Sequence, residues 1–84
     1  MTAHEEVIHD GTFRSLSDRQ QSELIGRYCA PVMERLSHIT ERSDAVRAID
    51  AACAEFDAQC HSMLVRQAVR RRMDALLIER WGDA

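Results

Sequence analysis

The stretch from Gln59 to Asp74, QCHSMLVRQAVRRRMD, brings two kinds of chemically active side chain close together in the sequence. Its Cys-His pair, Cys60 and His61, offers donor atoms that transition metals bind. The arginines that follow could bind phosphate groups or a partner protein; they are Arg66, Arg70, Arg71 and Arg72. Whether either set forms a site depends on the helix faces that its members occupy.

The most metal-like group in the chain consists of Cys53, Asp57, Cys60 and His61. Asp57 and His61 are four residues apart and share one face of a helix, which suits two ligands of one ion. Cys60, however, points about 100° away from His61, so one helix cannot direct all four side chains at a single metal. The tight Cys or His pairs of structural zinc sites are also missing here. We therefore interpret the cysteines as small buried apolar residues and predict neither a metal site nor a cofactor.

No set of residues in the sequence has the spacing of a known catalytic group. Glu34 and His38 share a helix face but lack the inward-facing carboxylates of a di-iron bundle. Cys29 lies in a hydrophobic stretch without a base to activate its thiol. Serine-protease spacing, phosphate-binding glycine loops and zinc-protease motifs are absent from the sequence. The sequence therefore predicts a protein that is not an enzyme.

The arginines of the basic segment do not form one stripe. Arg66 and Arg70 share a helix face, whereas Arg71 and Arg72 point elsewhere, so the group surrounds the helix. The net charge of −3 differs from the strongly basic balance of a non-specific nucleic-acid binder. All eleven basic residues are Arg, which reflects overall composition more than selection at one site. We interpret the segment as a solvated or partner-facing surface, with nucleic-acid binding as the second interpretation.

Length and composition limit the kind of protein. A chain of 84 residues buries only about 60% of its unfolded surface, so its own core is marginal. Three cysteines without paired spacing do not indicate a disulfide framework. The acidic start is not that of a signal peptide, and no apolar run approaches the roughly 20 residues that span a bilayer. These features predict a soluble, cytoplasmic protein without a membrane partner.

The first part of the chain is expected to form an arm followed by a kinked helix. Residues 1–16 show no sustained period, so they predict a flexible or loosely packed arm, and residues 17–84 predict one helical domain. Ser17 and Gln20 form a capping box at the helix start. The apolar positions of one helix face continue through Pro31, which favours a kinked helix over two separate ones; they are Ile25, Tyr28, Val32, Leu36 and Ile39.

The second part is expected to form one long helix. Thr40 or Ser43 can cap its start, and no Gly or Pro occurs after Pro31 until Gly82. We therefore predict a helix from about Ser43 to Trp81. The alternative is a break near residues 59–62, where Ser62 is the strongest signal, and this would give a three-helix bundle.

Two apolar stripes lie on opposite sides of this predicted helix. The first stripe consists of Val46, Ile49, Cys53, Phe56 and Cys60. The second consists of Val65, Val69, Met73, Leu76 and Leu77, about half a turn away. One continuous helix cannot bury both against a single short partner. Either the helix breaks, or the second stripe packs on another chain in an intertwined dimer of two hairpins, which is the arrangement that we predict.

Charge distribution agrees with antiparallel pairing of two copies of this helix, with the acidic half of one beside the basic half of the other. Residues 44–57 are mainly acidic and residues 62–73 are basic, so antiparallel alignment sets opposite charges side by side. We therefore expect an all-α protein: a helical hairpin with a kinked first helix, assembled as a homodimer. Its expected role is a non-catalytic protein–protein interaction or regulatory adaptor module. The alternative is a small nucleic-acid-binding regulator that uses the segment from Arg66 to Arg72.

Overall fold

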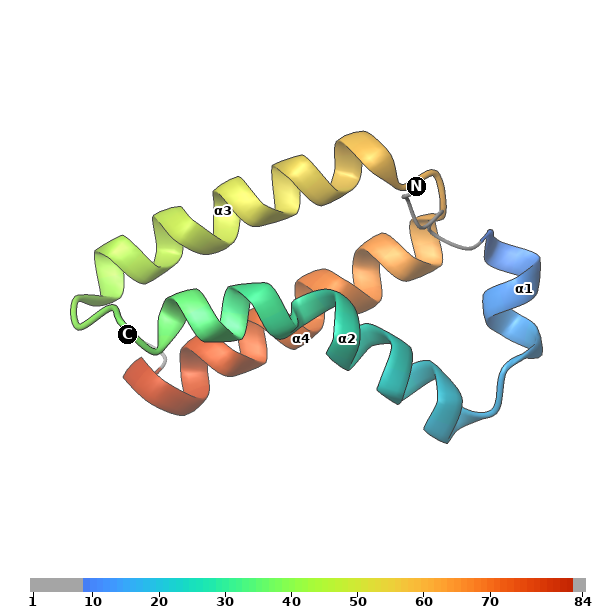
Figure 1. The fold of residues 1–84 in the computed structure, drawn as a ribbon, viewed down its shortest axis with the longest axis horizontal. Helices are drawn as coiled ribbons and strands as arrows, with labels where there is room; N and C mark the ends of the chain where they lie inside the picture. Colours follow the sequence, from blue (N-terminus) through green and yellow to red (C-terminus); the bar gives the residue numbers. More distant parts are fainter. Residues whose placement is uncertain (1–8, 83–84) are drawn as a thin grey trace.

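The computed structural model describes residues 9–82, and this part of the chain contains four helices and no strand. They are α1 (Asp10–Ser15), α2 (Asp18–Leu36), α3 (Arg42–Gln59) and α4 (Met63–Trp81). Helix α4 packs against both α2 and α3, and the short α1 packs on α4 at one end of the molecule (Figure 1). The predicted all-α class is confirmed, and α4 is the element on which the other helices assemble.

Helix α2 begins where the sequence predicts. The Ser17 hydroxyl accepts a hydrogen bond from the Gln20 amide at 3.1 Å, and the Gln20 side chain accepts one from the Ser17 amide at 3.0 Å. This reciprocal capping box satisfies two amides that have no partner within the helix. Pro31 lies inside α2, and Figure 1 shows the helix changing direction along its length. The missing N–H of Pro31 frees the carbonyl four residues earlier, which permits such a bend.

The prediction of one continuous helix from Ser43 to Trp81 is wrong, and the alternative break near residues 59–62 is correct. Helix α3 ends at Gln59, Cys60 adopts an extended conformation, and Ser62 caps α4 by accepting a hydrogen bond from the Val65 amide. The two helices fold back on each other (Figure 1). Because the break reverses the chain, both apolar stripes can face the same interior, which a straight helix would not permit.

The core is built from one side of each long helix. Helix α2 contributes Ile25, Cys29, Val32 and Leu36; α3 contributes Ala45, Ile49 and Cys53; and α4 contributes Val65, Val69 and Met73. Phe56, Leu76 and Leu77 pack against this core from its margin, and Cys60 is fully buried in the connection. The prediction that Val46 belongs to the buried stripe of α3 is wrong. Ala45 takes the buried position, and Val46 is only partly covered. Alanine allows α3 to approach its neighbours closely at this point.

Both predicted stripes are thus buried within one chain. The intertwined dimer was inferred because the second stripe needed a partner, and the fold removes that need by supplying α2 and α3 as the partners of α4. The arrangement within the chain is a helical bundle, not a hairpin with one long arm.

The last residues of the predicted N-terminal arm form helix α1. Within α1, the side chain of Phe13 is buried, and the Gln21 side chain donates a hydrogen bond to the Phe13 carbonyl at 2.9 Å. A six-residue helix is too short for its period to be recognised in the sequence. Residues 1–8 of the predicted arm lie outside the described residues. Among residues 9–82, no helix combines the length and apolar character needed to cross a bilayer.

Candidate functional site

Helix α4 carries all four arginines of the basic segment, and it places them on different flanks. One flank faces α3, and the other faces α1 and the first half of α2. Because successive residues of a helix are about 100° apart, neighbouring arginines meet different surroundings. The partners of each guanidinium therefore decide which of them is available to a ligand.

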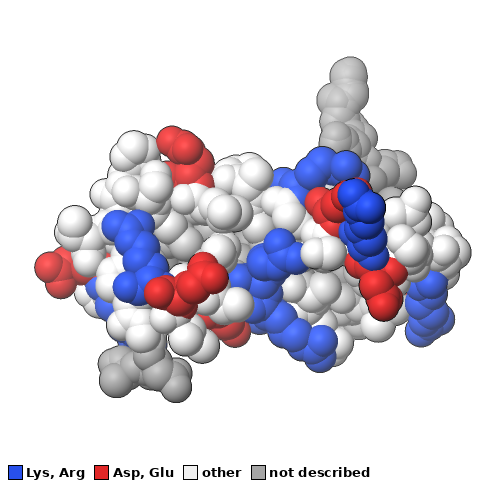
Figure 2. Space-filling model, turned by 90° about the horizontal axis from the view of Figure 1, so that it is seen from below, with Lys and Arg blue, Asp and Glu red and all other residues white. Residues whose placement is uncertain are grey.

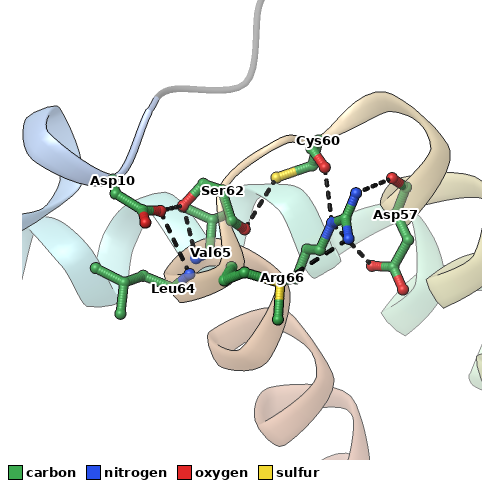
Figure 3. Close-up of polar contacts among 8 residues, drawn as sticks. Asp10, Asp57, Cys60, Ser62, Leu64, Val65 and Arg66 are labelled. Atoms are coloured by element: carbon green, nitrogen blue, oxygen red, sulfur yellow. Dashed lines mark hydrogen bonds and ion pairs between the residues drawn. The ribbon is translucent and has the colours of Figure 1, made fainter.

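Arg66 closes the corner between α3 and α4 (Figure 3). Its Nε donates a hydrogen bond to the Cys60 carbonyl, and its Nη2 donates one to the Asp57 carbonyl, each at 2.7 Å. The Asp57 carboxylate lies 3.9 Å from the same guanidinium. The last carbonyls of a helix lack partners within the helix, so Arg66 caps the C-terminus of α3. It is a structural residue and not a free cation.

Asp10 and Ser62 join α1 to the start of α4. The Ser62 hydroxyl accepts a hydrogen bond from the Val65 amide at 3.1 Å and donates one to the Asp10 carboxylate, and the Leu64 amide donates to the same carboxylate at 3.5 Å (Figure 3). The hydrogen bond from Ser62, together with that from Leu64 and the nearby charge of Arg14, lowers the pKa of Asp10 below its ordinary 3.8. A carboxylate at a helix N-terminus is also favoured by the helix dipole.

Arg70 and Arg72 tie α4 to its two neighbours. Arg70 pairs with the Asp50 carboxylate of α3 at 3.3 Å. Arg72 donates to the hydroxyl of Ser22 in α2 at 3.1 Å and to the Ser22 carbonyl at 3.4 Å. The sequence predicts pairing of acidic and basic segments between two copies of the chain, whereas the structure pairs them within one chain, where Asp50 meets Arg70 and Asp57 meets Arg66.

The C-terminal end of α4 binds the end of α2 in a way that the sequence did not indicate. Arg80 donates hydrogen bonds to the carbonyls of Leu36 and Ile39, the latter at 2.7 Å. Its guanidinium also lies 4.5 Å from the centre of the Trp81 ring, and the Trp81 indole donates to the Thr40 carbonyl at 2.9 Å. These contacts cap α2 through residues some 40 positions away, which no local pattern could reveal.

Arg71 differs from its neighbours. It is exposed, and among residues 9–82 it has neither a hydrogen bond nor an ion pair with another side chain or carbonyl. It lies on the rim of two grooves, one on each flank of α4. Of the predicted basic surface, Arg71 is the member that the fold leaves open to a ligand.

The larger of these grooves, which we call the α2–α4 groove, has a volume of about 580 Å³. Apolar side chains cover much of its surface: Phe13, Ile25, Leu64, Ala68 and Ala75. Polar side chains edge it: Asp18, Gln21, Ser22, Gln67, Arg71 and Arg72. A second groove of about 480 Å³ lies on the α3 flank, where Arg66 and Arg70 already have carboxylate partners. Arg71 lines both grooves, and the α2–α4 groove adds Arg72, which has no carboxylate partner among residues 9–82.

The metal-like group of the sequence is not brought together. Cys53 and Cys60 are buried, whereas Asp57 and His61 are exposed, and within residues 9–82 no three carboxylate, thiol or imidazole groups meet as metal ligands would. The Cys53 thiol lies 3.5 Å from the Met73 sulfur in the core. Burial raises the pKa of Cys29 and of Cys53, which keeps both thiols protonated. Glu34 and His38 form a pair at 3.1 Å on the exposed side of α2.

Charge on the visible surface is mixed. Figure 2 shows basic side chains interspersed with acidic ones and with uncharged surface, and no continuous basic stripe crosses this face. A surface of this kind suits contacts with a protein better than tracking along a phosphate backbone.

Comparisons of the chain with protein-family models, with curated proteins and with solved structures find no match.

Proposed function

We propose that the protein is a small non-catalytic interaction module that binds a helix of a partner protein in the α2–α4 groove. The observation that carries this proposal is the combination, in one groove of about 580 Å³, of apolar side chains and an exposed arginine that has no partner among residues 9–82. Between Leu64 and Ala75 the groove follows α4 for about 16 Å, roughly three helical turns. That length accommodates the anchors of an amphipathic helix at positions i, i+3 or i+4, and i+7.

The small residues of α4 allow a helix to approach closely. Ala68 and Ala75 lie seven residues apart, on one face of the helix, and each contributes only a methyl group to the groove. Larger side chains at the same positions would fill the space that a partner needs. The groove can therefore be blocked by one substitution at an exposed position, Ala75.

The other roles expected from the sequence have less support. A nucleic-acid-binding regulator would use the segment from Arg66 to Arg72, but Arg66, Arg70 and Arg72 are already hydrogen-bonded or paired to groups of the chain. The homodimer was inferred from an apolar stripe that the chain itself buries. Both remain outcomes of the test below and are not part of the proposal.

A peptide-display selection tests the proposal without assuming the sequence of the partner. The full chain is immobilised and exposed to random peptides of roughly 15 residues, about four helical turns. Binders are then compared on Ala75→Trp, which fills the groove, and on Ala54→Trp, which places the same ring on an exposed position of α3 outside the groove. We expect enriched peptides that bind the wild-type chain and Ala54→Trp alike and lose at least tenfold in affinity on Ala75→Trp.

Two results would contradict this function. Peptides whose binding does not change on Ala75→Trp would place the docking surface elsewhere. A concentration-dependent increase in solution mass that Ala75→Trp abolishes, measured by light scattering, would show that a second copy of the chain fills the groove instead of a partner helix.

A further inference from the structure

We infer that the partner helix bound in the α2–α4 groove is acidic, with carboxylates placed to meet Arg71 and Arg72. This inference rests on the proposed function and names the chemistry of the partner. The four arginines of the basic segment differ in their partners: Arg66 and Arg70 each have a carboxylate partner in α3, whereas Arg71 and Arg72 have none among residues 9–82. The hydrogen-bonding partner of Arg72 is Ser22, which is neutral.

The groove therefore presents two positive charges that pair with no carboxylate of residues 9–82. The one carboxylate among its lining residues is Asp18, at the first residue of α2, where it also has the favourable position of an acid in the first helical turn. The charge along the α4 side is consequently positive, although the chain as a whole carries −3. A ligand that sets carboxylates along α4 would be complementary to this side.

The same charges argue against a second copy as the occupant. A two-fold symmetric interface places the same patch on both sides. Two grooves packed face to face would enclose four guanidinium groups from Arg71 and Arg72 with the two carboxylates of Asp18, and this excess of like charge opposes association. A nucleic-acid duplex is also a poor occupant, because its affinity depends on many phosphate contacts and the groove offers two guanidinium groups.

The shape of the groove determines the rest of the pattern. Leu64 provides partly exposed apolar surface, the buried Ile25 lies beneath the groove, and Ala68 and Ala75 leave room for apolar anchors of the incoming helix. The inferred partner is an amphipathic helix with apolar residues at i, i+4 and i+7 or i+8 and with Glu or Asp beside that stripe, within reach of Arg71.

Three synthetic peptides with the same apolar stripe test the inference. The positions flanking the stripe carry Glu in the first peptide, Gln in the second and Lys in the third, and a scrambled Glu peptide loses the stripe but keeps its composition. Binding to the full chain is measured by fluorescence anisotropy. We expect the Glu peptide to bind about tenfold more tightly than the Gln peptide and the Lys peptide to bind most weakly, with the differences shrinking as salt is raised.

Charge reversal at Arg71 provides the matched comparison. In Arg71→Glu the preference should invert, so that the Lys peptide binds more tightly than the Glu peptide. Arg27→Glu makes the same change of net charge at an exposed position of α2 outside the groove, and it should leave the wild-type order intact. Circular dichroism of both variants should match that of the wild-type chain, since neither arginine has a partner among residues 9–82.

The outcomes separate this inference from the function on which it rests. Equal binding of the Glu, Gln and Lys peptides, still lost on Ala75→Trp, would overturn the acidic partner and keep the groove as a helix-binding site. Failure of every peptide, the display-selected ones included, would overturn the proposed function itself. Binding of the scrambled Glu peptide or of a short DNA duplex with the same dependence on Arg71 would show that the groove recognises negative charge without a helix, and would also overturn the inference.

Discussion

The arginines of α4 that face α3 differ in role from Arg71, which lies on the rim of the α2–α4 groove. On the α3 flank, Arg66 binds the last carbonyls of α3 and Arg70 pairs with Asp50. Arg71 lies on the rim of the grooves on both flanks, is exposed and has no partner among residues 9–82. Residues 70 and 71 are adjacent in sequence, so the difference comes from the rotation of about 100° between them. Arg66 and Arg70 are therefore structural residues, whereas Arg71, next to Arg70 in the sequence, is available to a ligand.

The largest expected effect is at Arg66. The substitution Arg66→Met keeps much of the apolar stem but removes both hydrogen bonds to the end of α3, and hydrogen bonds from a charged donor stabilise by about 1.5 to 3 kcal/mol each in protected settings. Because the guanidinium is partly exposed, we expect a loss of roughly 2 kcal/mol in the free energy of unfolding, measured by urea denaturation.

The matched substitution Arg71→Met should change the free energy of unfolding by less than about 0.5 kcal/mol, as is usual for a surface residue without specific contacts. Equal losses at positions 66 and 71 would remove the distinction between the flanks.

A smaller effect is expected at Ser62, in the corner of the α3 flank. Ser62→Ala removes the cap of α4 and the hydrogen bond to Asp10, and the loss of a serine cap costs about 1 kcal/mol. The pKa of Asp10 is lowered in the folded chain, so its ionised form stabilises the fold above the ordinary pKa of 3.8, and this contribution is lost as the pH falls through the lowered pKa. The difference between the variant and the wild-type chain should therefore be larger at pH 7 than below pH 3.8.

Thermal unfolding followed by circular dichroism at the two pH values measures this difference. Thr12→Ala, at an exposed position of α1, serves as the control for general effects of substitution near this end of the molecule. A difference that stays constant across the acid range would show that Asp10 does not act through Ser62.

The smallest effect is expected for the ion pair of Arg70 and Asp50. Both side chains are about half exposed, so water and salt screen their attraction. A double-mutant cycle of Arg70→Ala and Asp50→Ala should give a coupling of about 0.2 to 1 kcal/mol that declines with added salt. A coupling energy as large as the loss of unfolding free energy in Arg66→Met would mean that ion pairs stabilise the contact between α3 and α4 more than capping of the α3 carbonyls does.

Much of the local structure could be predicted from particular residues. Ser17 and Gln20 mark the start of α2, and the three-four spacing from Ile25 to Leu36 marks its buried face through Pro31. The break between α3 and α4 was harder to predict because Ser62 is its one clear signal and the sequence there lacks Gly and Pro. The choice between one helix and two depended on whether the chain could bury both stripes itself, which is a property of the assembled fold.

The roles of the arginines were not predictable in the same way. The sequence indicates that Arg66, Arg70, Arg71 and Arg72 face different directions, but the identity of the group that each one meets depends on helices up to fifty residues away. The contact between Asp10 and Ser62 also joins residues that are far apart in the sequence, as does the capping of α2 by Arg80. Neither could be predicted from a local pattern.

The sequence alone therefore determined the helical class, the buried face of α2 and the absence of a dominant basic stripe, because these follow from side-chain period and composition within one segment. The tertiary structure alone decided that both stripes of residues 43–81 pack in one core, that Arg66 and Arg70 are neutralised, and that Arg71 remains open beside the α2–α4 groove. The physical reason is that neutralisation and burial depend on distances between helices, and those distances are set only when the helices pack together.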